Sequence, residues 1–359
     1  MKENNRKVFP VEEVTGTPFQ MGKAIGESQK EITEELLSIT LDRINERRHN
    51  LNSISIEFAE QIARESIESV NDYSPDILEE VRGISLGSGL KVWETMLLNI
   101  RNQLGIAFDS GCTAVGVTGE KSESGNNLIG QNWDNDPEFD RFSVILTRRP
   151  KGKPDFISFT QPGLMAYIGL NSEGLGICMN ALMGPGRGSG VPWYFIVRKI
   201  FEQNNYDDVL KQVNRGIIAI PANAFITTST ELFDLEITDT NIETVFPDSN
   251  GVLIHTNHCV HPSLSKIADE YPDLIESKAR LPRAKKFFDS KPEKINSQDF
   301  KKILSDHEEF PRSICRHEND HPETGFWTSV VSVIINPSEN KMDISRGNPC
   351  SNEYVTYEL

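Results

Sequence analysis

Residues 109–122 read DSGCTAVGVTGEKS, and the character of the chain changes within this stretch. Before it, apolar residues recur every three or four positions, for example over residues 32–44, which is typical of helices that bury one face. After Gly111, short runs such as CTAVGVT and NNLIGQNW are separated by turn residues, which is typical of strands joined by hairpins. The stretch therefore divides a mostly helical first third from a strand-rich remainder.

The strand-rich part is predicted to contain blocks of antiparallel strands with helices between the blocks. Such blocks favour stacked sheets covered by helices. Six short strand-like runs lie between residues 112 and 180: CTAVGVT, NNLIGQNW, FSVILTRR, DFISFT, LMAYIGL and GLGICMN. Beyond them we expect helices near 193–203, 206–214, 276–288 and 297–305, and strands near 223–237, 242–245, 251–257, 327–336, 340–346 and 353–358.

The composition argues against several classes of partner. The chain has 359 residues, 37% of them hydrophobic, and a formal net charge of −16 at pH 7. Nucleic acids and anionic membranes attract basic patches, which this balance does not favour. The N-terminal MKENNRKVFPVEEV has no apolar run of signal-peptide length, and no stretch approaches the roughly 20 apolar residues that span a bilayer. We therefore expect a cytoplasmic protein that binds neither nucleic acid nor membranes.

The cysteines do not form a disulfide pattern. There are five, an odd number, and their spacing is wide. Without an export signal, a disulfide framework is not expected. Most of the five are expected to be buried, and four are expected to be structural: Cys178, Cys259, Cys315 and Cys350.

The fifth cysteine, Cys112, follows a glycine at the start of a predicted strand. If the bond between Gly111 and Cys112 were cut, Cys112 would carry a thiol and a free α-amine. That amine, with an ordinary pKa near 8, can take the thiol proton, so one residue would supply both nucleophile and base. Gly111 has no Cβ and tolerates close approach of the thiol to its carbonyl, which would allow an N-to-S acyl shift.

Several ordered motifs resemble one enzyme family. GCT at 111–113, followed by GNNLIGQNWD at 125–134, resembles the acyl-CoA:6-aminopenicillanate acyltransferase family of N-terminal nucleophile hydrolases. Choloylglycine hydrolases and penicillin V acylases are more distant relatives. EEVRGISLGSGL and WETMLLNIRNQL are similar to the helical pro-segment of the family, and GLGICMNAL, IHTNHC, PRSICRH and RGNPC follow in the family order.

The resemblance implies a role for five residues. Cys112 matches the self-processed nucleophile, and Asp134 matches the aspartate that orients its α-amine through a charge-assisted hydrogen bond. Asn257 matches the asparagine whose side-chain amide helps to form the oxyanion hole. Asn180 resembles a strand-end residue that contributes to the same hole in the choloylglycine branch. Arg316 matches an arginine near the nucleophile, where a fixed positive charge favours a thiolate.

With this resemblance, we predict an α+β fold of four layers, αββα, with two antiparallel sheets face to face and helices outside. The precursor is expected to cleave itself between Gly111 and Cys112, and Ser313 is expected to support this processing. The products would be a helical α chain, residues 1–111, and a catalytic β chain, residues 112–359, that remain together as one folding unit.

The predicted reaction cleaves or forms a linear, non-peptide C–N bond in a small molecule. The Cys112 thiol attacks an acyl carbon, and a thioester acyl-enzyme forms. Water or an amine then resolves it, and the sequence does not separate hydrolysis from transfer. The resemblance allows acyl-CoA as a co-substrate. We expect no other cofactor and no metal, and a homo-oligomer is compatible with the sequence.

Other interpretations of the sequence are a metal-dependent hydrolase and a small-molecule binding protein whose processing has been lost. The metal interpretation rests on His255, His258, Cys259 and His261, which are ligand types packed into seven residues. Their spacing fits poorly, because on a strand His255 and Cys259 share one face while His258 points to the other. A papain-like Cys–His pair is also conceivable, although its cysteine usually begins a helix.

Overall fold

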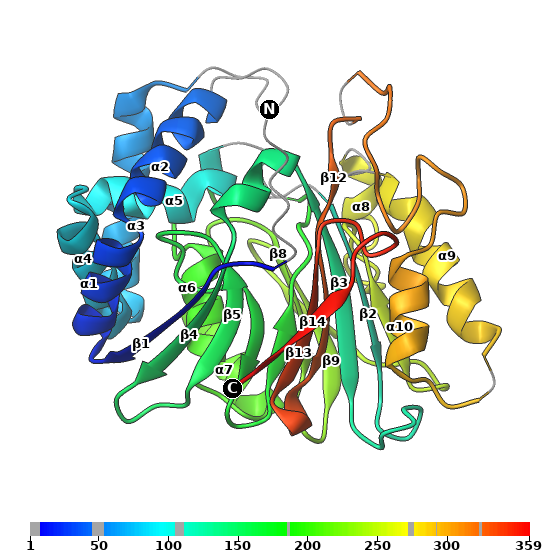
Figure 1. Cartoon of the computed structure of the whole chain (residues 1–359). Helices are drawn as coiled ribbons and strands as arrows, with labels where there is room; N and C mark the ends of the chain where they lie inside the picture. The colour runs from blue at the N-terminus through cyan, green and yellow to red at the C-terminus, as the bar shows by residue number, and fades with distance from the viewer. Residues whose placement is uncertain are drawn as a thin grey trace.

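The described residues form two β-sheets packed face to face, with helices on both outer faces (Figure 1). This arrangement confirms the predicted four-layer αββα fold. The structure is a computed structural model. It describes residues 8–44, 54–104, 111–184, 187–271, 276–291, 293–322 and 325–359.

The first sheet has eight strands in the order β1-β4-β5-β6-β7-β8-β9-β10. Its neighbouring strands are antiparallel except β1, which lies parallel to β4. The first third of the chain is mostly helical, as predicted, but β1 was not foreseen, because this edge strand buries only Val14 and so carries no strand periodicity. The bounds are β1 (Val11–Gly16), β4 (Val144–Pro150), β5 (Phe156–Thr160), β6 (Ile168–Asn171), β7 (Gly176–Cys178), β8 (Ala222–Thr227), β9 (Leu232–Ile237) and β10 (Ile242–Val245).

The second sheet has six strands in the order β11-β2-β3-β12-β13-β14, and β2 and β3 are buried along their whole length. The predicted strands lie close to those observed. The run LMAYIGL differs, because only its last three residues belong to β6. The bounds are β11 (Val252–His255), β2 (Gly111–Val117), β3 (Leu128–Asn135), β12 (Thr328–Asn336), β13 (Lys341–Arg346) and β14 (Tyr354–Glu358).

The helices cover the two sheets unequally. In Figure 1, α1–α7 lie on the side of the first sheet, whereas α9 and α10 cover the second. None of the helices within the described ranges combines the length and apolar character that a membrane span requires. The bounds are α1 (Pro18–Ser28), α2 (Lys30–Ile44), α3 (Ile56–Tyr73), α4 (Pro75–Ser88), α5 (Val92–Leu104), α6 (Trp193–Ile200), α7 (Tyr206–Arg215), α8 (Ile267–Glu270), α9 (Ser277–Asp289) and α10 (Ser297–Leu304).

Helices α1 and α4 touch backbone to backbone through glycines. Gly22 and Gly26 of α1 lie against α4, and Gly83 and Gly87 of α4 lie against α1. Residues four apart lie on the same face of a helix, so each pair forms a flat contact surface. A Cβ on Gly83 would lie 2.3 Å from the carbonyl oxygen of Phe19. The small side chain is therefore a packing requirement at this position.

We expect Gly83→Ala to lower the free energy of unfolding by about 2 kcal/mol or more, because the two helices must separate to admit a methyl group. The better helix propensity of alanine, roughly 1 kcal/mol, does not offset a clash with backbone. Urea unfolding followed by circular dichroism measures the change. The control Glu34→Ala lies at an exposed position of α2 and should stay within about 0.5 kcal/mol of the wild type. Equal stability of both variants would contradict this account of the α1–α4 contact.

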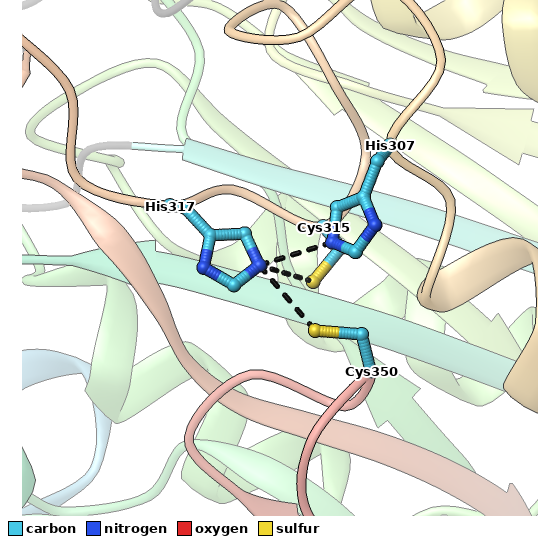
Figure 2. A group of neighbouring side chains, drawn as sticks. All are labelled: His307, Cys315, His317 and Cys350. Carbon is cyan, nitrogen blue, oxygen red and sulfur yellow. Dashed lines mark hydrogen bonds between the residues drawn. The ribbon is translucent and has the colours of Figure 1, made fainter.

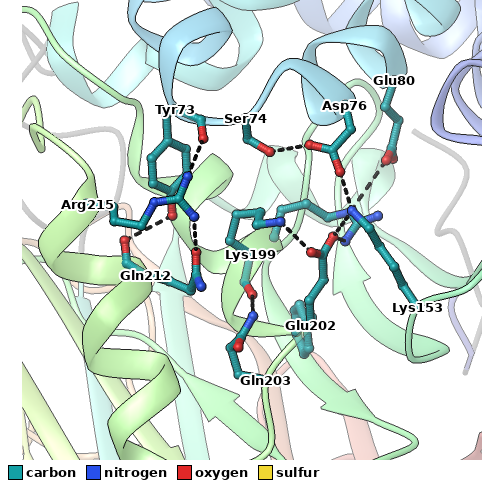
Figure 3. A network of polar contacts seen from close by, with 12 residues as sticks. Tyr73, Ser74, Asp76, Glu80, Lys153, Lys199, Glu202, Gln203, Gln212 and Arg215 are labelled. Carbon is teal, nitrogen blue, oxygen red and sulfur yellow. Dashed lines mark hydrogen bonds and ion pairs between the residues drawn. The ribbon is translucent and has the colours of Figure 1, made fainter.

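A polar network joins the helical layer to later parts of the chain (Figure 3). Lys153, in the turn after β4, contacts Asp76 of α4, and its Nζ lies 2.8 Å from a carboxylate oxygen of Glu202, just after α6. The Tyr73 hydroxyl donates to the carbonyl oxygen of Gln212 in α7 at 3.1 Å. The same helices and both sheets contribute to one continuous apolar core. The parts of the chain before and after residue 111 thus pack against each other through both polar and apolar contacts.

Candidate active site

Cys112 is the second residue of β2, a strand hydrogen-bonded on one side to β11 and on the other to β3. Its side chain is buried. Its backbone N–H donates to Oδ1 of Asn257 at 2.9 Å, and its carbonyl oxygen accepts from Nη1 of Arg280 at 2.5 Å. Gly111 lies opposite Asp134 in the β2–β3 pair. Both sides of the predicted cleavage bond are therefore described, and residues 105–110 lie outside the described part.

Asn257 lies in the turn that follows β11. Its side-chain oxygen accepts from the Cys112 backbone and from Nη2 of Arg280 at 2.7 Å. Its Nδ2 donates to the carbonyl oxygen of Ala181 at 3.0 Å, and its backbone N–H donates to Oγ of Ser277 at 2.6 Å. These contacts fix the orientation of the amide. Its oxygen faces Cys112, and its nitrogen faces the segment that follows β7.

Arg280, a residue that the sequence analysis missed, lies at the centre of the site. Its buried guanidinium reaches Cys112 and Asn257, and it also donates to Oγ1 of Thr113 at 2.7 Å. Burial lowers the pKa of Arg280, and this effect is opposed chiefly by the charge of Asp134. The signal in the sequence was helical spacing: Arg280 shares the buried face of α9 with Ser277, Ala284 and Phe288. The lysines and arginines beside it are typical of a helix face exposed to solvent.

Asp134 is linked to the loop of Arg316 through Ser329, a second residue that the sequence analysis missed. The Ser329 hydroxyl donates to Oδ1 of Asp134 at 2.6 Å and accepts from the backbone N–H of Arg316 at 2.9 Å. Nη1 of Arg316 lies 2.7 Å from a carboxylate oxygen of Glu276. Burial raises the pKa of Asp134, while Arg280, the Ser329 hydrogen bond and Arg316 act in the opposite direction.

Asn180 and Ser313, which were also predicted to take part, make other hydrogen bonds. Nδ2 of Asn180 donates to the carbonyl oxygen of His255 at 3.4 Å, and its neighbour Ala181 is the residue that contacts Asn257. The Ser313 hydroxyl donates to the carbonyl oxygen of Cys315 at 2.7 Å. This contact lies within the local turn, so it does not by itself support the predicted role of Ser313 in processing.

The four candidate ligands of the metal-dependent alternative, His255, His258, Cys259 and His261, do not converge on one point. His255 Nε2 lies 2.9 Å from Glu236, whereas His258 Nδ1 lies 2.7 Å from Ser277. Cys259 packs in a small apolar cluster. The turn after β11 sends these side chains in different directions, and periodicity along a strand cannot predict that.

His255 belongs to a buried charge cluster that supports the turn of Asn257. Both Glu236 and Asp234 face its ring, at 2.9 Å and 3.7 Å. The Glu236 carboxylate also accepts the backbone N–H groups of Val260 at 2.5 Å and His261 at 3.0 Å. Burial opposes the charge of the imidazole, but the two carboxylates outweigh it and raise the pKa of His255 to about 9. The cluster therefore holds both ends of the turn that carries Asn257.

We expect the protein to lose stability as the pH rises from about 6.5 to about 9, because the folded state retains the His255 proton that the unfolded chain releases near pH 6.5. His255→Gln cannot take up this proton. It should remove that part of the pH dependence and lower the free energy of unfolding at pH 6 by about 3 kcal/mol. Urea unfolding at several pH values measures both effects. His321→Gln, at an exposed position, is the control, and an unchanged pH profile in His255→Gln would contradict the prediction.

Comparison with known proteins identifies the family. Residues 121–351 match the family model described as acyl-coenzyme A:6-aminopenicillanic acid acyl-transferase. A curated relative, the 40 kDa form of acyl-coenzyme A:6-aminopenicillanic-acid-acyltransferase from Emericella nidulans, is 26% identical over 341 residues, covering 93% of this chain and 91% of that protein. The chain belongs to this acyltransferase family. Asp134, Asn180, Asn257 and Arg316 lie within the matched residues, and Cys112 lies just before them.

Solved structures of lower similarity were also found. A mutant of the conjugated bile acid hydrolase from Clostridium perfringens gives a TM-score of 0.47 at 12% identity, covering 69% of this chain and 97% of that one. Penicillin V acylase from Agrobacterium tumefaciens gives a TM-score of 0.49 at 10% identity, covering 69% of this chain and 86% of that one.

Proposed function

We propose that this protein is an N-terminal cysteine amidohydrolase or acyltransferase that activates itself by cleavage between Gly111 and Cys112. The observation that carries the proposal is the clamp on the Cys112 backbone. Asn257 holds its N–H and Arg280 holds its carbonyl oxygen, both within 3 Å. Burying an arginine and an asparagine costs free energy unless hydrogen bonds compensate. Here both side chains form hydrogen bonds with the backbone of Cys112.

Cleavage in this proposal begins with the Cys112 thiol. Its sulfur attacks the carbonyl carbon of Gly111, the C–N bond breaks, and the thiol proton passes to the departing nitrogen. Water then hydrolyses the thioester, which gives a carboxylate on Gly111 and restores the thiol beside a new α-amine. The thiol is buried in the intact chain, and the break frees one chain end next to it.

The α chain, residues 1–111, and the β chain, residues 112–359, would remain associated after cleavage. Their shared apolar core supports this, because separating them would expose it to water. A buried ion pair adds to the contact: Glu80 of α4 and Arg148 of β4 lie 2.8 Å apart, with both side chains 0% exposed. Breaking such a pair leaves an uncompensated buried charge, at a cost of roughly 3–5 kcal/mol.

In this proposal, the residues around Cys112 take part in substrate turnover after the chain has been cleaved. The α-amine of Cys112 accepts the thiol proton, and Asp134 orients that amine. Arg280 and Arg316 contribute positive charge that favours the thiolate. The Cys112 sulfur attacks the substrate carbonyl, whose oxygen becomes the oxyanion. Asn257 Nδ2 donates one of its two hydrogens to the carbonyl oxygen of Ala181, and in this proposal it donates the other to the oxyanion. Asn180 is the further candidate for this oxyanion hole.

The proposed substrates are small molecules with a linear amide bond or with an activated acyl group such as a thioester. The name of the Emericella relative gives acyl-coenzyme A and 6-aminopenicillanic acid as its substrates. We therefore propose acyl-CoA thioesters as acyl donors for this chain and an amine or water as the acceptor. An acceptor pocket that excludes water would favour transfer over hydrolysis.

Denaturing mass spectrometry of the purified wild-type protein tests this function. We expect two polypeptides, residues 1–111 and 112–359, and N-terminal sequencing should read Cys-Thr-Ala for the second. Brief incubation with an activated acyl ester should add one acyl group to Cys112. A single intact chain that forms no acyl adduct would overturn the proposal and favour a small-molecule binding protein.

A further inference from the structure

Four metal-ligand side chains converge at a place that the proposed reaction does not use (Figure 2). They are His307, Cys315, His317 and Cys350, and their ligand atoms all lie within 4.8 Å of one another. Figure 2 shows the ring of His317 facing the other three, which come from the loop before β12 and from the turn between β13 and β14. Cys315 is buried, whereas Cys350 is exposed in this turn.

The three distances from Nε2 of His317 are close to those of a tetrahedral site. Nε2 of His317 lies 3.0 Å from Nε2 of His307, 3.6 Å from Sγ of Cys315 and 3.3 Å from Sγ of Cys350. Zinc bonds of about 2.0–2.1 Å to nitrogen and about 2.3 Å to sulfur place tetrahedral ligands about 3.3 Å apart for N–N pairs and about 3.6 Å apart for N–S pairs. The remaining pairs lie no more than 4.8 Å apart, so all four ligand atoms are within reach of one ion.

The surroundings also suit a metal ion. Nδ2 of Asn348 points to Sγ of Cys315 at 3.8 Å and donates to the carbonyl oxygen of Arg316 at 2.6 Å. N–H groups directed at ligand sulfur are typical outer partners of such sites. The backbone N–H of Cys315 is held by the carbonyl oxygen of Asp306 at 2.9 Å. The ligand-bearing loops are thus held in place by contacts with the protein itself.

We propose that His307, Cys315, His317 and Cys350 form a structural zinc site. Two thiolates and two imidazoles complete four-coordination and leave no open position, which distinguishes structural from catalytic zinc. Cys315 and His317 flank Arg316, so the ion would tie the backbone of this arginine to the turn of Cys350. The site is independent of the proposed reaction, because none of its ligands takes part in that reaction.

Metal analysis of tag-free protein, purified without chelators, tests the site. We expect about one zinc ion per chain in the wild type, and a loss to background in His317→Ala and Cys350→Ser. His321→Ala, an exposed histidine of the adjacent loop, is the matched control and should retain the metal. Asn348→Ala should weaken zinc affinity by about 10–100-fold. Zinc-free wild-type protein that takes up no added zinc would overturn the proposal, as would full retention of zinc in His317→Ala.

A second measurement uses the wild type alone and so does not depend on the folding of a variant. Cobalt added to the chelator-treated protein should produce thiolate charge-transfer and tetrahedral visible bands that zinc removes. Zinc should also protect Cys315 and Cys350 from alkylation, as peptide mapping would show, while Cys112 gains no such protection. Isolation of the protein with a Cys315–Cys350 disulfide and no metal would contradict the site.

Discussion

Cys112→Ala should yield a single polypeptide of 359 residues where the wild type yields two. Alanine has no thiol to attack the Gly111 carbonyl, so neither the acyl shift nor the thioester can form. Turnover of an activated acyl donor should fall by about 10⁴-fold or more, because nucleophile and base are lost together. Denaturing mass spectrometry and a steady-state acyl-transfer assay measure the two effects.

The matched control for this variant is Cys178→Ala. Cys178 is fully buried in β7, and burial raises the pKa of its thiol. A thiol in that environment is a poor nucleophile, so its loss should leave cleavage and turnover unchanged. Residues 1–111 and 112–359 appearing in Cys112→Ala would show that the cut does not depend on this sulfur.

Asn257→Asp should separate the two roles of this side chain. An aspartate keeps an oxygen that can accept from the Cys112 N–H and from Arg280, but it loses the Nδ2 donor. We expect the chain to be cleaved, while kcat falls by about 10²–10³-fold because the oxyanion loses a donor. Asn257→Leu removes both groups, and there cleavage should fail as well. Mass spectrometry and the acyl-transfer assay again provide the measurements.

The control for these variants is Asn241→Asp, which changes an exposed asparagine in the turn between β9 and β10 and should have wild-type activity. Circular dichroism shows whether Asn257→Leu folds, since leucine leaves the buried guanidinium of Arg280 with one acceptor fewer. Asn257→Asp with wild-type kcat would rule out Nδ2 as an oxyanion donor.

β2 was predictable because GCTAVGV is a short, mainly apolar run bounded by turn residues. β3, LIGQNWDN, is equally buried although Gln131, Asn132, Asp134 and Asn135 are polar. β10, which is only half-buried, has the predicted bounds, Ile242–Val245. β1 was not predictable, because a parallel edge strand that buries only Val14 needs its partner β4 to be recognised. LMAYIGL shows the reverse error: all seven residues were predicted to form a strand, but the first four are apolar and buried without belonging to one.

The two polar side chains that the sequence analysis missed lie far along the chain from the residues they contact. Arg280 is 168 residues from Cys112, and Ser329 is 195 residues from Asp134. A buried arginine in a basic helix has the same local pattern as an exposed one. Its burial depends on which face of α9 packs against the second sheet, and that is a property of the assembled layers.

Local pattern established most of the order of helices and strands and the placement of Gly111–Cys112 at the start of a strand, and the resemblance to a known family supplied the motifs. The spacing of apolar side chains and the positions of turn residues involve only a few neighbouring residues, so short stretches of sequence reveal them. Packing decided that Arg280 reaches Cys112, that the histidines of 255–261 diverge, and that His307, Cys315, His317 and Cys350 converge. These side-chain contacts depend on distances of a few ångströms between loops and helices that are far apart in the chain, and only the folded structure sets those distances.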